Sequence, residues 1–547
     1  MKVDLLYFAI PQQAEVRWSL GNILGLPDTP QKLAPVLDAW IQTTASDYGL
    51  FWDMRLGLPD PEVIQRTIRL PGDIWHAGLR LGTGKSSRII DFIAPTWMFN
   101  SNSDPLMEST SFRLSFQACL LKTDILRQLG GPNPAFQTLL GAALEMGHRF
   151  LYAGVIMRHI PWLVTHTLSV PNDALPFRDE LLFAWLRYGS FWTRWTLVRA
   201  VATKYAAPSV ALKAFLDVRN RKRGGSDYFQ RGPINGATPV GATKVCILIP
   251  TLGRYQYLRK LLNQIQNLAV KPFEVIIVDQ TDPSHRDNAL AEDFGALPLK
   301  VIYEESPGQC SSRNVGISRV TGEYILFLDD DDDEIEPDLI EKHLKTLWRF
   351  NADVSSGIVN EIDTDMPKEK VVRISDVFPT NNTLVRKEVL NKSGLFDLAY
   401  DRGERADGDL GMRVYLSGAV MVLNPAISVL HHHALSGGLR VHKARVITYS
   451  SSRKKLFHRN LPSVTEIYLA LRYFTSRQVH EMLWLQVFGT FSLHGSAIKK
   501  ILKILISSMF LPHTVWSIKK RYAQATEMLS NYPQIPWLSE NLSTREK

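Results

Sequence analysis

Residues 322–337 read GEYILFLDDDDDEIEP. The apolar run at 324–328 is typical of a strand buried on both faces of a parallel sheet, and Pro337 predicts the start of a helix over 338–348. Five aspartates, 329–333, separate the two elements. A run of acidic residues is usually a solvated surface, but this run lies where a buried strand ends. Carboxylates at such a strand end are suited to Mg²⁺ or Mn²⁺, so the position favours a metal site.

Two further apolar runs precede this stretch. VCILIP at 245–250 and FEVIIV at 273–278 have the composition of buried strands, and 257–268 between them has helical spacing. Strands alternating with helices predict an open α/β sheet, in which ligands bind at the carboxyl ends of the strands. Asp279 therefore lies where it can reach a ligand. The guanidinium of Arg313, among small residues, suits a phosphate or a ribose.

In their order and spacing, residues 244–436 resemble family 2 glycosyltransferases of the GT-A fold. The matching segments are Ile249-Pro250-Thr251 with Arg254, Val278-Asp279, Arg313-Asn314-Val315-Gly316, 322–328 with the aspartates and Pro337, 381–386, and Asp407-Gly408-Asp409-Leu410. The resemblance implies an α/β catalytic domain with a Rossmann-like mixed sheet. It also implies the transfer of a sugar from a nucleotide-sugar donor to a hydroxyl of a glycan or lipid-linked acceptor.

The resemblance implies roles for single residues in holding the donor. Asp279 would contact the nucleotide base and Arg313 would help to hold the nucleotide. The positions implied to bind the donor are Pro250, Thr251, Arg254, Asp279, Arg313 and Asp330.

A Mg²⁺ or Mn²⁺ ion would bridge the donor's diphosphate. Counted back from Pro337, Asp330 and Asp332 best match the family's metal-binding pattern, and Asp331 is an alternative. A histidine after the strand expected at 426–430 can complete such a site, and His431 fits best. His433 would point the same way if the strand continues.

The acceptor hydroxyl needs a general base to become a good nucleophile. Asp407 matches the family's catalytic acidic position, although Ala406 stands where the family often has Glu. For Asp409 the alternative is a cap of the helix expected at 410–416. One displacement assisted by one base inverts the anomeric centre, as the family does.

The positive charge of the 547-residue chain is concentrated at one end. The net charge is +9, and the residues from 434 onward carry 17 Lys/Arg and 5 Asp/Glu, which leaves the rest of the chain slightly acidic. This tail has no recognisable nucleic-acid-binding motif, so we expect no nucleic acid as partner. Three cysteines form no disulfide or zinc pattern, and a reducing compartment is expected.

The tail contains two apolar stretches, 482–498 and 498–516, bordered by lysines. Neither is long and apolar enough for a certain membrane span. Their composition suits helices that lie at the surface of an anionic membrane, and the alternative is packing on the protein's own core. We expect a cytoplasmic protein, peripheral on the inner face of the cytoplasmic membrane.

The chain is expected to fall into four parts: 1–165, a degenerate GT-A-like domain; 166–243, a helical segment and linker; 244–436, the catalytic domain; and 437–547, a basic helical tail. The first part rests on two ungapped alignments, 49–64 with 325–340 and 120–130 with 384–394. Met54 and Leu56 then correspond to Asp330 and Asp332. Counted back from the aligned Gly147 and Gly418, Phe136 corresponds to Asp407. Chance similarity of two α/β segments is the alternative.

A non-catalytic, sugar-nucleotide-binding scaffold of a polysaccharide assembly complex is the alternative function. The sequence disfavours it, because the second copy keeps the carboxylates that the first copy lacks.

Overall fold

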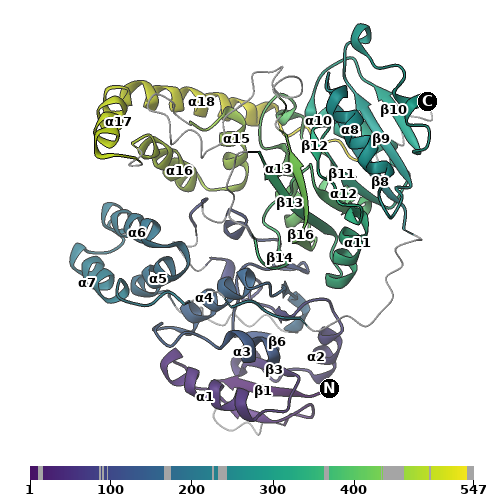
Figure 1. Cartoon of the computed structure of the whole chain (residues 1–547). Coiled ribbons are helices and arrows are strands. Elements are labelled where there is room, and N and C mark those ends of the chain that lie inside the picture. Colours follow the sequence, from purple (N-terminus) through teal and green to yellow (C-terminus); the bar gives the residue numbers. More distant parts are fainter. Residues whose placement is uncertain are drawn as a thin grey trace. The chain divides into compact units, whose positions relative to one another are not determined.

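The computed structural model describes residues 1–9, 17–85, 88, 91–94, 97–165, 174–224, 227–231, 243–362, 369–432, 434, 461–491 and 495–538. These residues group into two compact units, one made of 1–235 with 371–374 and the other of 236–370 with 375–547. Figure 1 labels their helices and strands. His433 and residues 166–173, 225–226 and 232–242 of the expected helical segment and linker lie outside the described residues.

The first unit is built on a seven-stranded mixed sheet in the order β2-β1-β3-β6-β4-β7-β5. Its strands are β1 (Val3–Phe8), β2 (Ile23–Gly25), β3 (Tyr48–Asp53), β4 (Ile74–His76), β5 (Ser109–Thr110), β6 (Ala118–Lys122) and β7 (Met157–His159). Its helices are α1 (Pro30–Thr43), α2 (Pro61–Ile68), α3 (Thr123–Leu129), α4 (Leu139–Tyr152), α5 (Phe177–Phe183), α6 (Ser190–Ala202) and α7 (Pro208–Val218).

The second unit is built on a mixed sheet in the order β10-β9-β8-β11-β15-β13-β16-β12. Its strands are β8 (Val245–Thr251), β9 (Glu274–Asp279), β10 (Leu299–Tyr303), β11 (Tyr324–Phe327), β12 (Asp332–Asp333), β13 (Val354–Glu361), β15 (Thr383–Arg386) and β16 (Met421–His431). The short strand β14 (Arg373–Ile374) belongs to the first unit. Its helices are α8 (Tyr255–Gln266), α9 (Leu290–Asp293), α10 (Gln309–Arg319), α11 (Leu339–Phe350), α12 (Lys387–Ser393), α13 (Ala406–Leu416), α15 (Val464–Tyr473), α16 (Ser476–Gly489), α17 (Ala497–Met509) and α18 (Leu511–Asn531).

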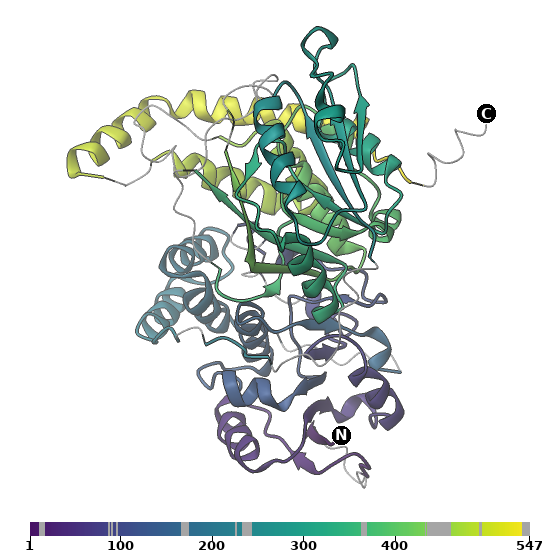
Figure 2. The ribbon, with the colours of Figure 1, turned by 45° about the vertical axis from the view of Figure 1, so that its right-hand side comes forward.

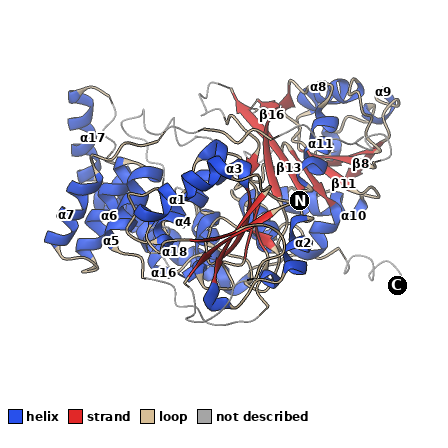
Figure 3. Ribbon diagram, turned by 90° about the horizontal axis from the view of Figure 1, so that it is seen from below, coloured by secondary structure: helices blue, strands red, loops and turns tan. Residues whose placement is uncertain are grey.

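The predicted α/β catalytic fold with a helical tail is confirmed. The three apolar runs form β8, β9 and β11, which are parallel and almost entirely buried. They are buried because amphipathic helices cover them. In α8, for example, the buried residues Leu258, Leu261, Leu262 and Ile265 repeat at helical spacing. Figure 3 shows the strands in red and the helices beside them in blue.

Six strands of each sheet lie side by side in the same spatial order. They also follow one another along the chain in the same sequence and run in the same relative directions. Moving from β2 to β7, the successive pairs are parallel, parallel, antiparallel, antiparallel and parallel. The series from β9 through β8, β11, β15 and β13 to β16 repeats these directions. This shared strand order supports the internal repeat and argues against chance similarity, because independent α/β folds have many alternative strand orders.

The register of the strand pairs is also the same in the two units. Tyr48 pairs with Lys122 as Tyr324 pairs with Arg386, and Val3 pairs with Tyr48 as Val245 pairs with Tyr324. The alignment of 49–53 with 325–329 therefore holds in three dimensions. Met54 and Leu56 occupy the positions of Asp330 and Asp332 and are 3% and 4% exposed.

The alignment of the helix before the last central strand was wrong. Gly147 lies inside α4. The counterpart of Gly418 is Gly154: both have φ near +90° and both precede by three residues the first residue of the strand, Met421 or Met157. The count from Gly147 failed because Gly147 is an interior residue of α4, whereas Gly418 lies beyond the end of α13. Ala143, not Phe136, therefore corresponds to Asp407, and the conclusion that this copy lacks the base is unchanged.

The corrected alignment reveals an ion pair present in both units. Glu145 on α4 corresponds to Asp409 on α13, and each pairs with an arginine one turn later. Arg149 Nε lies 3.6 Å from Glu145, and Arg413 Nε lies 2.9 Å from Asp409. Each arginine also donates to the carbonyl of the last residue of the preceding helix, Leu129 or Ser393. This buried contact fixes one helix to another, which explains why the degenerate copy retains it.

Each sheet is followed by helices, α5–α7 in the first unit and α15–α18 in the second (Figure 1). In the second unit α15 packs on the catalytic domain and buries Ile467 and Tyr468 completely. No single helix among the described residues is long and apolar enough to cross a membrane. Only α17 and α18 taken together meet that test, and the pair is bent by 59°.

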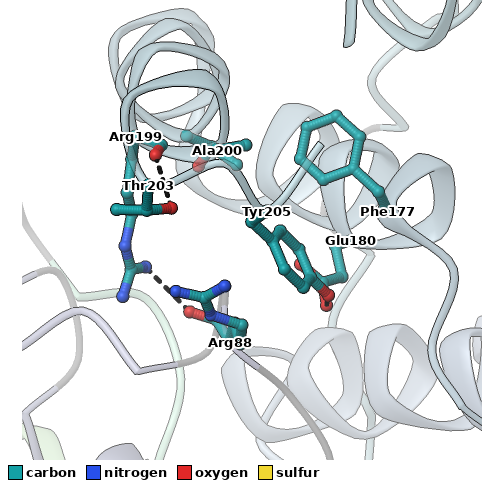
Figure 4. Close-up of a pocket in the computed structure, with 8 residues that line it drawn as sticks. Arg88, Phe177, Glu180, Arg199, Ala200, Thr203 and Tyr205 are labelled. Carbon is teal, nitrogen blue, oxygen red and sulfur yellow. Dashed lines mark hydrogen bonds between the residues drawn. The ribbon is translucent and has the colours of Figure 1, made fainter. Parts of the chain in front are cut away.

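A buried carboxyl group joins the helices of the first unit (Figure 4). Glu180 on α5 is 2% exposed and accepts a hydrogen bond of 2.6 Å from the hydroxyl of Tyr205, whose ring lies under the guanidinium of Arg88. Its second oxygen, Oε2, accepts no hydrogen bond among the described residues. Burial raises the pKa of Glu180 from 4.5 to about 7, despite the opposing hydrogen bond from Tyr205.

We therefore predict that Glu180 makes the protein less stable as the pH rises. Between pH 4.5 and 7 the folded chain keeps a proton on Glu180 that the unfolded chain has lost, so stability falls across this window and stays lower above it. Glu180→Gln should raise the melting temperature by a few degrees at pH 8 and change it little at pH 4.5. Thermal unfolding at both pH values, with the exposed Asp124→Asn as control, tests this; an equal effect at both pH values would contradict it.

Candidate functional site

The strand register places the predicted donor-binding residues at one edge of the second sheet. Thr251, the last residue of β8, pairs with Asp279, the last residue of β9. The neighbouring β11 ends at Phe327, so the aspartates begin at the same edge. Pro250 precedes Thr251 in β8. The carboxyl ends of three parallel strands therefore meet where the sequence predicted a ligand site.

Four of the five aspartates are buried. Asp330, Asp331, Asp332 and Asp333 are each at most 4% exposed. Asp332 and Asp333 form the short strand β12, which pairs with His431 and Leu430 at the end of β16. The run is therefore folded inward, and the solvated-surface alternative is excluded. Buried carboxylates need hydrogen bonds and opposite charges, and their partners define the site.

Arg254 and Thr251 hold the first buried carboxylate. Arg254 Nη1 lies 3.0 Å from Asp330 Oδ1 and 3.2 Å from Asp331 Oδ1, and the hydroxyl of Thr251 donates to Asp330 Oδ2 at 2.8 Å. Burial still raises the pKa of Asp330 to about 6, because Arg254 offsets only part of the desolvation. The two aspartates in turn raise the pKa of Arg254 against its own burial, so the guanidinium remains charged.

His431 is the second cation of the cluster. Its Nδ1 lies 3.1 Å from Asp332 Oδ1 and 3.6 Å from Asp331 Oδ1. Burial alone would favour the neutral ring, but the hydrogen bond to Asp332 and the charge of Asp331 raise the pKa of His431 to about 9. His431 is therefore an imidazolium at neutral pH. Asn381, from the segment before β15, also donates to Asp332 Oδ1, at 3.3 Å.

Asp333 has a different environment from the three aspartates before it. It accepts hydrogen bonds from Lys260 and Gln264 of α8 and from His432 Nε2, the last at 2.6 Å. These partners hold its pKa well below the usual range although burial opposes them. Because its oxygens are fully engaged, Asp333 anchors the run to α8 and is not a free ligand.

Asp279 and Arg313 lie at the same edge but have partners of their own. The hydroxyl of Tyr255 donates to Asp279 Oδ2 at 2.5 Å, and the amide of Thr281 donates to Oδ1 at 2.9 Å. Arg313, on α10, reaches Asp329 Oδ1 at 2.5 Å. Gly316, one turn further along α10, lets this helix approach the sheet, since a Cβ there would lie 2.2 Å from Leu248.

Asp407 and Asp409 differ in their exposure to solvent and in their contacts. Asp407, in the first turn of α13, is exposed and its carboxylate makes no hydrogen bond with any described residue. Asp409 is completely buried, and its carboxylate contacts Arg413, Arg472 and Tyr473. The structure therefore leaves Asp407 open to a substrate and gives Asp409 a structural role, which is to fix the helix and not to cap its end.

The sequence analysis missed a residue that organises the site, Asp401. Its Oδ1 accepts hydrogen bonds from the amides of Cys310 and Ser311 at 2.8 and 2.9 Å, and so caps α10, the helix that carries Arg313. Gly308 makes room for it, since a Cβ there would lie 2.3 Å from this carboxylate. The only signal was an acidic residue in a loop 90 residues downstream, which no local pattern could connect to α10.

The donor chemistry of the cluster can be compared with the needs of a divalent cation. Asp331 Oδ1 is buried and accepts no hydrogen bond of good geometry, although Arg254 and His431 lie within ionic distance. Hard carboxylate oxygens with an open lone pair suit Mg²⁺ or Mn²⁺. In the described part of the chain, however, no three His, Cys, Asp or Glu side chains are already spaced as metal ligands. Arg254 and His431 balance the negative charge of the aspartates, which a bound metal ion would otherwise balance.

The sequence of this segment is similar to that of known glycosyltransferases. The family model described as glycosyl transferase family 2 matches residues 246–400. The chain is 29% identical to "Glycosyltransferase GlyA" of Streptococcus pneumoniae over 213 residues, 34% of this chain and 30% of that protein. It is 28% identical to the "GalNAc(5)-diNAcBac-PP-undecaprenol beta-1,3-glucosyltransferase" of Campylobacter jejuni over 93 residues, 16% of this chain and 30% of that protein.

The chain spans about a third or less of the length of these curated relatives. Among solved structures, residues 1–349 of Staphylococcus aureus TarS in complex with UDP-GlcNAc match with a TM-score of 0.35 and 16% identity, over 53% of this chain and 92% of that one. The segment that matches the glycosyl transferase family 2 model, 246–400, supplies most of the buried carboxylate cluster and its counter-charges.

Proposed function

We propose that the protein is an inverting, metal-dependent glycosyltransferase that moves a sugar from a nucleotide-sugar donor to a hydroxyl of a glycan or lipid-linked acceptor. The observation that carries the proposal is the buried cluster of Asp330, Asp331 and Asp332 at the carboxyl ends of parallel strands, within a family 2 domain. Burying such a cluster costs free energy of folding, and only one of the two units contains it. This supports a functional role for the cluster and not a role in stabilising the fold.

The donor would lie along the edge formed by β8, β9 and β11. Asp279, oriented by Tyr255 and Thr281, would accept hydrogen bonds from the base. Thr251, Arg254 and Arg313 would lie beside the diphosphate, where guanidinium groups bind phosphate oxygens well. Arg254 could exchange its carboxylate partners for phosphate oxygens.

Asp330, Asp331, Asp332 and His431 would hold a Mg²⁺ or Mn²⁺ ion, which would supply positive charge opposite the diphosphate as it leaves. His431 would have to release its proton first, and the raised pKa of about 9 makes metal binding pH-dependent. The unsatisfied Oδ1 of Asp331 supports this assignment.

Asp407 would act as the general base. As the acceptor oxygen forms its bond to the anomeric carbon, the carboxylate takes the hydroxyl proton and the bond from that carbon to the diphosphate breaks. A single displacement of this kind inverts the configuration. The exposed position of Asp407 on the first turn of α13 gives an acceptor room to approach it.

We also propose that the protein acts at the inner face of the cytoplasmic membrane, where lipid-linked glycans are within reach. Helix α17 supports this: Ile501, Leu505 and Met509 are 59–68% exposed, and Lys499 and Lys500 border them. The helix lies at the outer end of the tail, away from its sheet (Figure 2). An apolar face edged by lysines suits an anionic bilayer surface.

Asp407→Asn should reduce kcat by at least about a hundredfold, because the acceptor loses its base, while donor affinity should stay nearly unchanged. The donor is first identified by a thermal-shift screen of nucleotide sugars with Mn²⁺. The matched control is Glu404→Gln, a neighbouring carboxylate, which should retain activity. Normal turnover by Asp407→Asn would refute the assignment.

Asp332→Asn should weaken the Mn²⁺-dependent binding of a nucleoside diphosphate by at least about tenfold, since a ligand oxygen is lost. Isothermal titration with Mn²⁺ and with EDTA measures the effect. Glu336→Gln, just beyond the run, is the control. Equal affinity of wild type and Asp332→Asn for UDP and GDP with Mn²⁺ would argue against the metal site.

Ile501→Ser combined with Leu505→Ser should reduce binding to vesicles that contain phosphatidylglycerol by at least about tenfold. Substitutions are preferable to removing the tail, because α15 carries Arg472, which pairs with the buried Asp397 and Asp409. Ile362→Ser with Val377→Ser, also exposed apolar residues of this unit, is the control pair. Undiminished cosedimentation of the α17 variant would rule out this helix as the membrane contact.

A further inference from the structure

Helix α6 has its polarity reversed relative to an ordinary surface helix. Its buried residues are Thr193, Thr196 and Ala200, whereas Phe191 and Val198 are 63% and 57% exposed. In a water-soluble helix the large apolar side chains face the core. Here the hydroxyl of Thr196 is buried without a hydrogen bond partner in the described structure. Phe191 and Val198 face outward, while Leu197 and Val201 are partly buried.

The neighbouring helix α7 shows the same pattern. It packs through Ala211, Ala214 and Val218, and it exposes Val210, Leu212 and Leu216 by 54%, 56% and 45%. Small residues between helices and large apolar residues on the outside are characteristic of helices in contact with lipid. Phe191, Val198, Val210, Leu212 and Leu216 are thus the exposed large apolar residues of these two packed helices, and we call them together the α6–α7 surface.

Helix α17, in the other repeat, has the same reversal. Its buried residues are Lys503 and Ser507, and its exposed residues include Ile498, Ile501, Leu505 and Met509. Each GT-A-like sheet is thus followed by helices with outward-facing apolar residues. Two occurrences of one reversed pattern at the same place in an internal repeat are evidence that the pattern is functional.

The charge around the α6–α7 surface identifies its partner. No Asp or Glu occurs between Glu180 and Asp217, whereas this interval contains five basic residues: Arg187, Arg194, Arg199, Lys204 and Lys213. Arg194, Lys204 and Lys213 are exposed. The interval between Glu481 and Glu527, which contains α17, likewise has six basic and no acidic residues. The exposed Asp217 at the end of α7 is paired with Arg178 and Arg221, so positive charge predominates around the apolar side chains. Apolar side chains in such surroundings are complementary to an anionic bilayer surface.

We infer that the α6–α7 surface is a second membrane-binding surface, which inserts Phe191, Leu212 and Leu216 among the lipids while Arg194, Lys204 and Lys213 contact anionic headgroups. The inference rests on the proposed membrane location and adds the degenerate repeat to it. The first unit, which lacks the catalytic carboxylates, would then serve as a membrane anchor. Two modest contacts in one chain bind cooperatively, as with two lipid anchors.

The experiment uses the full-length chain with an environment-sensitive fluorophore on Leu212→Cys. The native cysteines Cys119, Cys246 and Cys310 are all buried, so the new thiol is labelled selectively. Vesicles of phosphatidylcholine with phosphatidylglycerol should shift the emission to the blue, and pure phosphatidylcholine should shift it less. Leu106→Cys, 72% exposed elsewhere in the same unit, is the matched control and should show no shift.

Vesicle flotation of full-length variants is a second test of the inference. Phe191→Ser/Leu212→Ser/Leu216→Ser should reduce vesicle binding at least about tenfold, and Leu58→Ser/Leu106→Ser should leave it unchanged. The Ile501→Ser/Leu505→Ser variant separates the two surfaces. If it alone abolishes binding and labelled Leu212→Cys never responds to vesicles, the α6–α7 surface is not a membrane contact, while the proposal for α17 stands. If the label is shielded without vesicles and the chain elutes as a dimer, the surface binds a second copy and the inference is wrong.

Discussion

The constraint on which the second unit depends is the burial of four consecutive carboxylates at the end of one strand. Isolated, they would repel one another and disfavour folding. Asp330 and Asp331 are balanced by Arg254, Asp332 by His431, and Asp333 by Lys260. These partners come from β16 and from the start of α8, so the position of the aspartates requires the strand order of the sheet. The charge cluster and the fold around it stabilise each other.

The first unit has the same strand order without the buried carboxylates. The same six strands pair in the same register, yet Met54 and Leu56 replace the carboxylates and are buried without any counter-charge. What the repeat has kept is the pair between Glu145 and Arg149, which ties α4 to the preceding helix. Comparing the copies identifies a structural pair: Asp409 supports the fold and has a counterpart in Glu145, whereas Asp407, the proposed base, has no acidic counterpart.

The sequence was sufficient for the parallel strands, for the position of the aspartates at a strand end and for the shared strand order, because each leaves a local signal: an apolar run, a charge at its end, or a shared spacing. It was not sufficient where partners are distant. Nothing near Asp401 indicates that it caps α10, and nothing near Arg472 indicates that it pairs with Asp397 and Asp409. The count from Gly147 failed because the sequence pattern did not distinguish a glycine inside a helix from the glycine with positive φ that follows it, Gly154.

The basic tail, which the sequence presents as one feature, divides physically into two. Helix α15 belongs to the catalytic domain: Thr465 and Glu466 contact the loop before α13, and Arg472 reaches the buried carboxylates behind it. Helix α17 instead exposes its apolar side chains. Because α15 contacts both the loop and the helix that bear Asp407, the segment leading to the proposed membrane contact also supports the proposed base. A bilayer that oriented α17 would therefore act on the same helical framework that supports the proposed base.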